Sequence, residues 1–396
     1  MKDRKKVLII YKFLPQYRVA FFELLKKKLL DHNIDLDLVY GQSNKTDALK
    51  NDEAKIEWAK PVENKFIKFR GKNFIWQPCM RDLHGKDLVI TLSENKLLIN
   101  YYLMASRFFS SYKYACWGHV YNMQNDINNF DNKIKLFFAN SCDWWFAYTT
   151  GARDFLIKRK YPANQITVVQ NAIETAELKE DYQKITNEQV NELKGQLGID
   201  SENVAIYCGS LYPEKDFDFI LEACYRTREA IPDFHMLFVG AGVEAAKIKE
   251  AAEKHPWIHY VGPKFGKDRA IYFKISKVQL MPRLIGLAIV DSFVLETPTI
   301  TTEHPFHGPE IDYLENGING IKTADSMDEY SKAVINVFKT GQYRDLLPGC
   351  RAAAEKYTVE HMAENFTQGV LQCLSIKPVS DPGIVIQPEM KPEKQV

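Results

Sequence analysis

The sequence lacks the short motifs that mark zinc-binding and disulfide-stabilised proteins. Its seven cysteines are odd in number, stand far apart and form no Cys-x-x-Cys pair, so neither a zinc site nor a redox motif is indicated. Most of them stand inside apolar runs such as "VAIYCGS" (204–210). We therefore expect buried, free thiols in a protein of a reducing compartment.

Long hydrophobic runs are also missing. No window approaches the roughly 18 apolar residues of a membrane-spanning helix. Near the N-terminus, basic residues precede the apolar run "VLIIY" (7–11), which is too short for the core of a secretion signal and leads into charged residues. We expect a cytoplasmic protein that is either soluble or peripheral at the inner face of the cell membrane.

The net charge is only +1, but the two halves of the chain differ. Residues 1–170 hold 28 Lys and Arg against 17 Asp and Glu, a net charge of +11, and the rest of the chain comes to −10. The split predicts that the first half faces an anionic partner. Two solvated surfaces that merely differ in charge would give the same count.

The basic residues of the first half gather in three runs, at 4–6, 26–28 and 158–160, and stand among aromatic residues that include Phe21 and Phe22. Basic residues combined with aromatic ones are typical of segments that bind an anionic membrane surface. Such a surface is therefore an expected partner. Nucleic acid is not, because the sequence shows no nucleic-acid-binding motif.

The length and the composition indicate two globular domains. The chain has 396 residues, and single hydrophobic cores stop growing near roughly 250 to 300 residues. Apolar residues make up 45% and charged residues 26%, as in globular proteins. We expect an N-terminal domain at 1–172, a C-terminal domain at 173–376, and a loose, Pro-rich tail at 377–396.

Strand-like apolar runs alternate with helix-length amphipathic stretches in both halves. Runs such as "KVLIIY" and "DLVITL" come first, and "NVAIYCGSL", "HMLFVGAG" and "VQLMP" follow a polar segment at 174–202. This alternation predicts an α/β fold with two doubly wound parallel sheets. Ligands of such sheets bind beyond the carboxyl ends of the strands, so the two domains are expected to share one cleft.

Two loops in the second half carry residues suited to a phosphate. Gly209 ends a strand, where it lets the backbone approach a ligand, and Lys215 follows in the loop before a helix. "FVGAGVE" (238–244) adds a second glycine turn at the same edge but lacks the third glycine of a dinucleotide fingerprint. Since Gly-x4-Gly-Lys-[Ser/Thr] is missing as well, NAD binding and a P-loop are not indicated.

The stretch "PRLIGLAIVD" (282–291) is typical of a strand end, a turn and a helix. Gly286 stands where the helix is expected to begin, and free N–H groups at a helix N-terminus suit a diphosphate. Asp291 follows five residues later, where its carboxylate could accept hydrogen bonds from a ribose diol. Glu310 in "HGPEIDYLENGING" (307–320) belongs to another loop at this edge.

The run from about 203 to 323 resembles the nucleotide-binding domain of the family 4 retaining glycosyltransferases, which have the GT-B fold of two Rossmann-like domains. The family has a strand ending Gly-Arg-Leu with a Lys shortly after, a Glu-x7-Glu motif holding Phe-Gly, and a Pro-Glu-Ile loop followed by Asn-Gly. The similar segments are Gly209-Ser210-Leu211 with Lys215, "RLIGLAIVD" and "GPEIDYLENGING", and "VVQNAIET" (168–175) resembles the family's linker strand.

The sequence departs from this pattern at three positions. Ser210 replaces the phosphate-binding Arg, Arg283 replaces the first Glu, and Asp291 replaces the second. Our hypothesis is that Arg283 supplies the positive charge that Ser210 lacks. The resemblance also implies that Gly286 and Leu287 contact the donor.

The first half resembles the family less specifically. "YKFLPQYRVAFFELL" (11–25) places Gln16, Tyr17 and Arg18 in the first strand-to-helix loop, where the family contacts the acceptor or the transferred sugar. His119 stands at a strand end in "CWGHVYN", and resembles the family's cleft histidine that hydrogen-bonds the donor sugar.

The resemblance implies a retaining glycosyltransferase that moves a hexose from a UDP-, GDP- or similar nucleotide sugar to a glycan or lipid-linked glycan, in surface polysaccharide synthesis. Lys215, the helix N-terminus and Arg283 would neutralise the leaving diphosphate, and His119 and Glu310 would orient the sugar. No Asp-x-Asp pair stands at an expected strand end, so we expect neither a metal nor a bound cofactor.

Two alternatives remain open from the sequence. A sugar-nucleotide 2-epimerase can share the two-domain fold but would use no acceptor. A non-catalytic protein that binds nucleotide sugars would fit the missing Arg and Glu.

Overall fold

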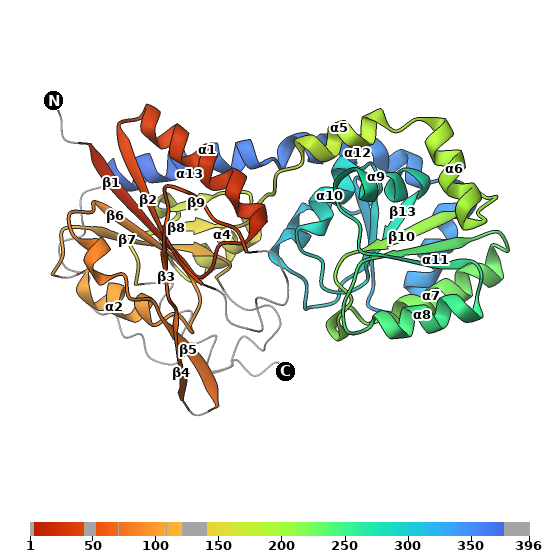
Figure 1. Ribbon diagram of the computed structural model, residues 1–396, viewed down its shortest axis with the longest axis horizontal. Coiled ribbons are helices and arrows are strands. Elements are labelled where there is room, and N and C mark those ends of the chain that lie inside the picture. The colour runs from red at the N-terminus through yellow and green to blue at the C-terminus, as the bar shows by residue number, and fades with distance from the viewer. Residues whose placement is uncertain (1–3, 43–52, 70, 108, 121–140, 376–396) are drawn as a thin grey trace, which may run out of the picture.

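The structure is a computed structural model that describes residues 4–42, 53–69, 71–107, 109–120 and 141–375. Two α/β domains lie side by side, one at the left and one at the right of Figure 1. The two parallel-sheet domains expected from the sequence are confirmed. The expected tail at 377–396 lies outside the described residues.

In the described part of the chain, the first domain contains a sheet of seven parallel strands in the order β3-β2-β1-β6-β7-β8-β9. Its central strands are continuous apolar runs because helices cover both faces of a parallel sheet. The strands are β1 (Lys5–Tyr11), β2 (Ile34–Gly41), β3 (Lys60–Val62), β6 (Leu88–Leu92), β7 (Lys113–Gly118), β8 (Trp144–Ala147) and β9 (Ile166–Val168). The helices are α1 (Val19–Asp31), α2 (Leu98–Ser106) and α4 (Thr150–Lys158), with short 3-10 turns η1 (Gln16–Arg18), η3 (Met80–Leu83) and η4 (Ala163–Gln165).

The second domain contains a sheet of six parallel strands within the described residues, in the order β12-β11-β10-β13-β14-β15. The strands are β10 (Val204–Cys208), β11 (His235–Val239), β12 (Ile258–Gly262), β13 (Val278–Leu280), β14 (Thr299–Thr302) and β15 (Gly320–Thr323). The helices are α5 (Ala176–Lys184), α6 (Asn187–Leu197), α7 (Phe217–Ala230), α8 (Ala245–Lys254), α9 (Gly266–Ile275), α10 (Ala288–Val294), α11 (Met327–Thr340) and α12 (Tyr343–Lys356), with 3-10 turns η5 (Pro213–Lys215) and η6 (Pro309–Tyr313).

The last described helix, α13 (Val359–Ser375), returns to the first domain and lies beside α1 (Figure 1). Phe366 stacks on Phe146 of β8, with ring centroids 4.1 Å apart, and contacts Trp117 of β7. The range 173–376 that the sequence predicted for the C-terminal domain therefore ends with a helix of the first core. Its apolar face indicated burial, but periodicity alone does not identify the sheet that a helix covers.

Helix α1 corrects one expectation about the membrane. Phe21 and Phe22 are fully buried, together with Leu25 and Leu29, in the core of the first domain. Residues at this helical spacing share one face, and that face packs on the sheet. These two phenylalanines are therefore not part of a membrane-binding surface, contrary to the prediction.

All seven cysteines are buried and free, as predicted, and the reducing compartment stays a prediction. The search for membrane spans in the described residues finds no helix that combines the length and the apolar character needed to cross a bilayer. A two-stranded antiparallel hairpin, β4 (Lys65–Phe69) and β5 (Lys72–Trp76), belongs to neither large sheet and projects from the first domain (Figure 1).

Candidate functional site

The strand order of the second sheet reverses between β10 and β13, which are hydrogen-bonded neighbours. Ligands of doubly wound sheets bind outside the carboxyl ends of the strands at such a switch point. Gly209 directly follows β10, and the stretch 281–287 follows β13. The structure thus brings together the two stretches that the sequence analysis singled out.

The two glycine turns of this edge pack directly against each other. Gly209 and Gly240 have φ angles of 155° and 151°, and a Cβ atom on Gly240 would lie 1.9 Å from the Gly209 carbonyl oxygen. A Cβ on Gly242 would lie 2.0 Å from the carbonyl oxygen of Leu211. Gly240 and Gly242 are therefore needed for close backbone packing after β10 and β11, a requirement that does not depend on a ligand.

Lys215 reaches the stretch that follows β13. Its Nζ donates a hydrogen bond to the carbonyl oxygen of Leu284, and only 7% of the residue is exposed. Burial lowers the Lys215 pKa to about 8, because desolvation disfavours the charged ammonium. Among the described residues it forms no ion pair, so its charge is available to an anionic ligand.

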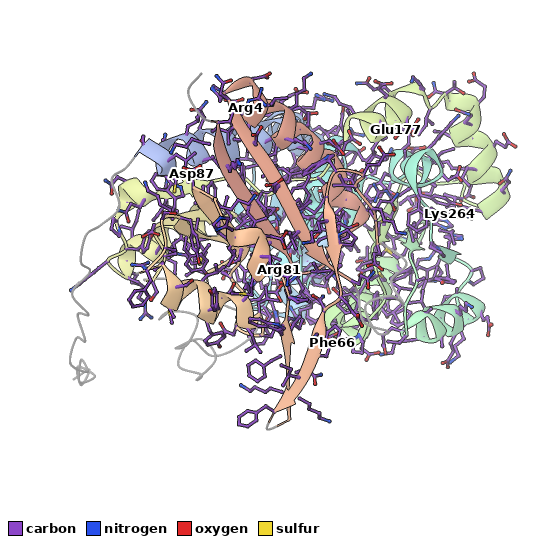
Figure 2. All side chains as sticks on the ribbon, turned by 60° about the vertical axis from the view of Figure 1, so that its left-hand side comes forward. Arg4, Phe66, Arg81, Asp87, Glu177 and Lys264 are labelled. Carbon is purple, nitrogen blue, oxygen red and sulfur yellow. The ribbon has the colours of Figure 1, made fainter. Side chains whose placement is uncertain are left out.

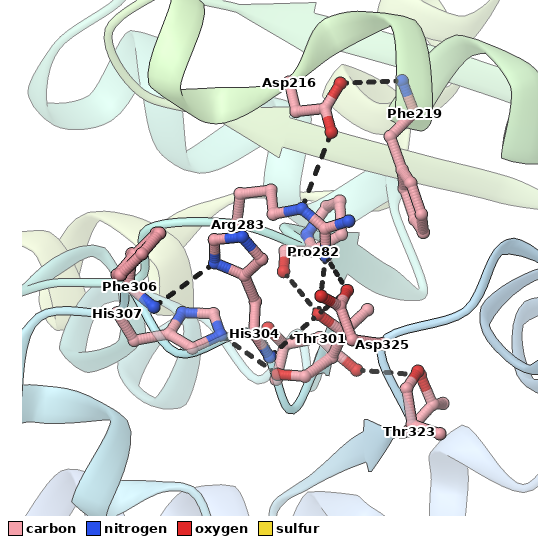
Figure 3. Close-up of polar contacts among 12 residues, drawn as sticks. Asp216, Phe219, Pro282, Arg283, Thr301, His304, Phe306, His307, Thr323 and Asp325 are labelled. Carbon is pink, nitrogen blue, oxygen red and sulfur yellow. Dashed lines mark hydrogen bonds and ion pairs between the residues drawn. The ribbon is translucent and has the colours of Figure 1, made fainter. Parts of the chain in front are cut away.

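Arg283 is engaged by carboxylates (Figure 3). Its Nε lies 3.5 Å from Asp216 Oδ2, and its Nη1 contacts Asp325 Oδ1 and donates to Thr302 Oγ1 at 2.8 Å. The guanidinium also lies over the Phe219 ring, 4.3 Å from the centroid. Two carboxylates already balance this charge, so the structure favours a structural role, and the predicted phosphate contact of Arg283 stays a prediction.

His307 holds the backbone that precedes α10. Its Nδ1 accepts a hydrogen bond from the Ile285 N–H at 3.1 Å, and its Nε2–H donates to the Thr302 carbonyl at 3.0 Å. An accepting Nδ1 requires a neutral ring, and burial lowers the His307 pKa to about 4. A Cβ on the next residue, Gly308, would lie 2.7 Å from the Ile285 carbonyl oxygen. The loop 307–308 therefore fixes the position of 285–286.

Helix α10 is shorter than expected. It covers only Ala288–Val294, and its N-cap is Leu287, whereas the sequence predicted a helix that begins at Gly286. Gly286 and Leu287 are half-buried in the turn before the helix. The free N–H groups of the helix therefore begin after Leu287, and the predicted contact of this helix N-terminus with a diphosphate stays a prediction.

Asp291 is paired within the second domain. Both of its carboxylate oxygens accept hydrogen bonds from Arg269 of α9, at 3.0 and 3.1 Å. Asp291 is 8% exposed, and burial raises its pKa while Arg269 opposes this rise. In the structure its carboxylate is therefore occupied by Arg269, and the predicted contact with a ribose stays a prediction.

A buried polar chain connects the two domains. Glu310 of η6 accepts a hydrogen bond from Asn171 Nδ2, and Asn171 Oδ1 accepts one from Arg18 Nη2. Arg18 also donates to the Ala172 carbonyl at 3.2 Å. All three charged or amide side chains are at least 96% buried. Burial raises the Glu310 pKa, while the hydrogen bond from Asn171 opposes the rise.

The structure therefore brings the predicted residues Arg18 and Glu310 together through Asn171, which was not among the predicted site residues. Asn171 stands in the quoted linker "VVQNAIET", so the resemblance to the family's linker strand was the signal that could have found it. Gln16 and Tyr17, the other two predicted residues of the first loop, are exposed.

His119 lies at the carboxyl edge of the first sheet, directly after β7. Its carbonyl oxygen accepts a hydrogen bond from Ser93 Oγ at 2.9 Å, and its half-buried ring lies 6.2 Å from the ring of Tyr148. Tyr148 follows β8, and its carbonyl faces the Tyr313 hydroxyl of the second domain at 3.4 Å. His119 is thus close to the contact between the domains. Ser210, the last predicted residue, is exposed after β10.

In the parts of the chain that the structure describes, no group of three or more His, Cys, Asp or Glu side chains is arranged to hold a metal ion.

Residues 202–340 match the family model described as glycosyl transferases group 1. No curated protein sequence matches the chain. Among solved structures, HepE of Anabaena in complex with UDP is similar, with a TM-score of 0.66, 13% identity, and coverage of 92% of this chain and 99% of that one. A glycosyltransferase from Rickettsia africae has a TM-score of 0.65, 15% identity, and coverage of 95% and 100%. Sucrose-phosphate synthase from Thermosynechococcus elongatus has a TM-score of 0.65, 13% identity, and coverage of 93% and 99%.

The chain has the GT-B fold. At these low identities the similar structures show the fold alone, whereas the family match over 202–340 supports glycosyl transfer as the general activity. The matched segment covers most of the second domain, and it contains Lys215, Arg283, Asp291 and Glu310. The narrower assignment to family 4 stays a prediction.

Proposed function

We propose that the protein is a retaining, metal-independent glycosyltransferase of family 4 that moves a hexose from a nucleoside diphosphate sugar to a glycan or lipid-linked glycan. The observation that carries the proposal is the position of Lys215. Its buried ammonium lies at the switch point of the second sheet, bonded to the Leu284 carbonyl, inside the segment that matches group 1 glycosyltransferases.

The role of Lys215 follows from the charge that develops during transfer. As the bond between the sugar and the diphosphate breaks, negative charge grows on the leaving phosphate, and a preorganised cation lowers the energy of that state. With a pKa of about 8, the ammonium is mostly protonated near pH 7. Because it is buried, its attraction to an anion is screened less than that of a surface lysine.

The remaining residues divide into those that contact substrates and those that support the site. His119 and Glu310 would orient the sugar, and the exposed Gln16, Tyr17 and Ser210 are free to meet the acceptor or donor. Arg283 would support the loops through its ion pair with Asp325, and Asp291 would join α9 and α10 through its ion pair with Arg269. We assign no side chain as a nucleophile.

The proposal includes a location and a biological role. An enzyme that extends a lipid-linked glycan during surface polysaccharide synthesis would act in the cytoplasm, at the inner face of the cell membrane. The basic first half of the chain, with a net charge of +11, supports this placement.

A thermal-shift panel of nucleotide sugars and free nucleoside diphosphates, measured with a chelator present, tests the donor part. We expect one nucleotide class to raise the Tm, and Lys215→Met to remove the shift. Lys247→Met is the matched control, because Lys247 lies on the surface at α8 and pairs with Asp218. A shift that needs added metal would contradict metal independence.

Product analysis with the stabilising nucleotide sugar tests the reaction. Release of the nucleoside diphosphate that rises when a glycan acceptor is added supports transfer. A donor converted to its C2 epimer without acceptor would instead identify an epimerase, and binding without any turnover would identify a non-catalytic protein.

A further inference from the structure

The hairpin β4–β5 exposes large apolar side chains next to one another. Phe66, Ile67 and Phe69 fall within five consecutive residues and are 45%, 46% and 60% exposed. Figure 2 shows Phe66 on this hairpin where it stands out from the body of the first domain. Gathered apolar side chains on a projecting element mark a surface that contacts another molecule or a membrane.

The register of the hairpin places apolar side chains on both of its faces. Ile67 pairs with Phe74, so these two side chains share one face, and Phe66, which pairs with Ile75, points to the other. A flat protein partner would cover only one face of such a ribbon. Insertion into the boundary layer of a bilayer would surround the ribbon and bury both faces at once.

The charges of the hairpin select an anionic surface. Lys65, Lys68 and Lys72 are exposed, and neither strand sequence, "KFIKF" or "KNFIW", contains an acidic residue. Lysines at the surface of a bilayer keep their ammonium groups among the lipid headgroups, while their aliphatic stems lie along apolar surface. A polyanionic glycan would match the lysines but would leave the phenylalanines in water, so a lipid surface fits better.

The base of the hairpin is fixed to the domain. The Ile75 N–H donates to the Lys96 carbonyl at 2.7 Å, and Gln77 Nε2 donates to the Tyr11 carbonyl at 2.9 Å. Helix α2 contacts β5 and contains no charged residue in "LINYYLMAS", with Tyr102 41% exposed. The hairpin therefore projects from a firm base, beside a second uncharged surface.

We propose that the hairpin β4–β5, with α2 beside it, docks the first domain onto an anionic lipid bilayer. The ribbon lies at the level of the headgroups, because its outer edges carry backbone N–H and C=O groups that cannot enter the hydrocarbon without partners. The inference deepens the proposed location at the inner face of the membrane and rests on it, although docking itself uses no donor or acceptor. It also moves the membrane contact away from the lysines at 26–28.

The run at 26–28 is a weaker candidate because the protein itself occupies it. Lys28 forms an ion pair with Glu364 of α13 at 2.6 Å. Lys26 lies over the Trp58 ring, 3.9 Å from its centroid. Their charges are thus partly committed within the first domain.

Vesicle sedimentation with the full chain tests the proposal, with vesicles of phosphatidylcholine alone or containing phosphatidylglycerol. We expect binding only to the phosphatidylglycerol vesicles, and weaker binding as salt is added. Two triple variants test the hairpin. The apolar variant is Phe66→Ser, Ile67→Ser, Phe69→Ser, and the charge variant is Lys65→Gln, Lys68→Gln, Lys72→Gln. Each should bind the phosphatidylglycerol vesicles about tenfold more weakly than the wild type.

Matched controls separate a docking site from a general loss of hydrophobicity or charge. Val243→Ser with Phe265→Ser removes two side chains that are each 79% exposed in the second domain, and should leave vesicle binding unchanged. Lys26→Gln with Lys28→Gln should change it less than threefold. Because the substituted hairpin residues are exposed, each variant should keep the Tm and circular dichroism of the wild type.

Three results would overturn the proposal. The wild-type protein could fail to bind phosphatidylglycerol vesicles, or the hairpin variants could bind like the wild type. Alternatively, light scattering could show a dimer that the apolar hairpin variant abolishes, which would identify the hairpin as a contact between two copies. Lys215→Met should bind vesicles normally, so failure of docking and failure of the proposed transfer reaction remain distinguishable.

Discussion

Arg269 of α9 and Asp291 of α10 form a bidentate ion pair, with N–O distances of 3.0 and 3.1 Å. Asp291 is the residue that the sequence resemblance linked to a donor ribose, yet its carboxylate joins two helices of the second domain. Its side chain is 11% exposed and that of Arg269 is 23% exposed, so the pair is largely shielded from water.

Asp291→Asn should reduce stability more than donor binding. The change leaves the Arg269 guanidinium largely buried without its partner, which we expect to lower the free energy of unfolding by about 2 to 4 kcal/mol. Urea denaturation measures this loss, and calorimetry on the folded variant should show a donor Kd within about threefold of the wild type. If Asp291→Asn instead binds the donor tenfold more weakly and keeps the stability of the wild type, the predicted contact between Asp291 and the ribose is supported.

Lys215 makes diphosphate affinity depend on pH. Burial lowers its pKa to about 8, so the ammonium is charged below that pH and becomes neutral as the pH rises through it. Affinity for a nucleoside diphosphate should therefore fall between about pH 7.5 and 9 as the cation is lost. Titration calorimetry across this range measures the change.

Lys215→Arg is the control, because a guanidinium keeps its charge at pH 9. Its affinity should be nearly constant over the same range, even if it is weaker than that of the wild type at pH 7. If the affinities of the two proteins depend on pH in the same way, Lys215 does not contact the diphosphate.

Lys215 and Arg283 should differ in their effect on the same ligand. Lys215→Met should weaken diphosphate binding about tenfold or more, as expected when a charged hydrogen bond worth about 1.5 to 3 kcal/mol is lost. Arg283→Met should weaken it less than about threefold, because Asp216 and Asp325 already balance the Arg283 charge. Calorimetry at one pH compares the two. Equal losses would support the hypothesis that Arg283 replaces the missing phosphate-binding Arg.

His307 should make the protein less stable in mild acid. Its folded pKa is lowered to about 4 from the ordinary 6.5, so the unfolded chain takes up a proton between these values and the folded chain does not. The stabilising effect of the neutral ring is thus complete above about pH 6.5 and is lost as the pH falls toward 4. His259, whose pKa is likewise lowered to about 4, contributes in the same direction.

Urea denaturation at several pH values between 7 and 4.5 measures this dependence. His307→Gln keeps a donor and an acceptor but no titrating ring, so its stability should fall less steeply with acid than that of the wild type. The same slope in both proteins would show that His307 titrates alike in the folded and unfolded chain.

The sequence predicted the parts of the site that depend on local order. Gly209 and Lys215 follow a strand and precede a helix, and this order alone places them at a carboxyl edge. The sequence did not reveal the ion-pair partner of each charged side chain. Asp325 lies 42 positions from Arg283, and Arg269 lies 22 positions from Asp291. Such pairings depend on how loops of different strands pack, so Arg283 and Asp291 looked available for a ligand in the sequence alone.

A similar limit applies to the helices. The spacing of Phe21 and Phe22 with Leu25 and Leu29 indicated an apolar face for α1, but such a face can lie on a sheet or on a membrane. The sheet is favoured because a continuous parallel sheet needs helices on both faces. The hairpin β4–β5 differs, because its apolar side chains are exposed. Its two short strands gave no clear prediction from the sequence, and the exposure is visible only in the structure.

Helix α13 has a consequence for synthesis of the chain. Because it supplies Met362, Phe366 and Val370 to the first core, that core contains segments from both ends of the described sequence. While the ribosome is still translating the second domain, Phe146 and Trp117 lack the ring of Phe366 that later packs on them. The sheet of the second domain has no such dependence on α13, since its strands and covering helices are contiguous in sequence. We therefore expect the domain that is translated first to complete its folding last.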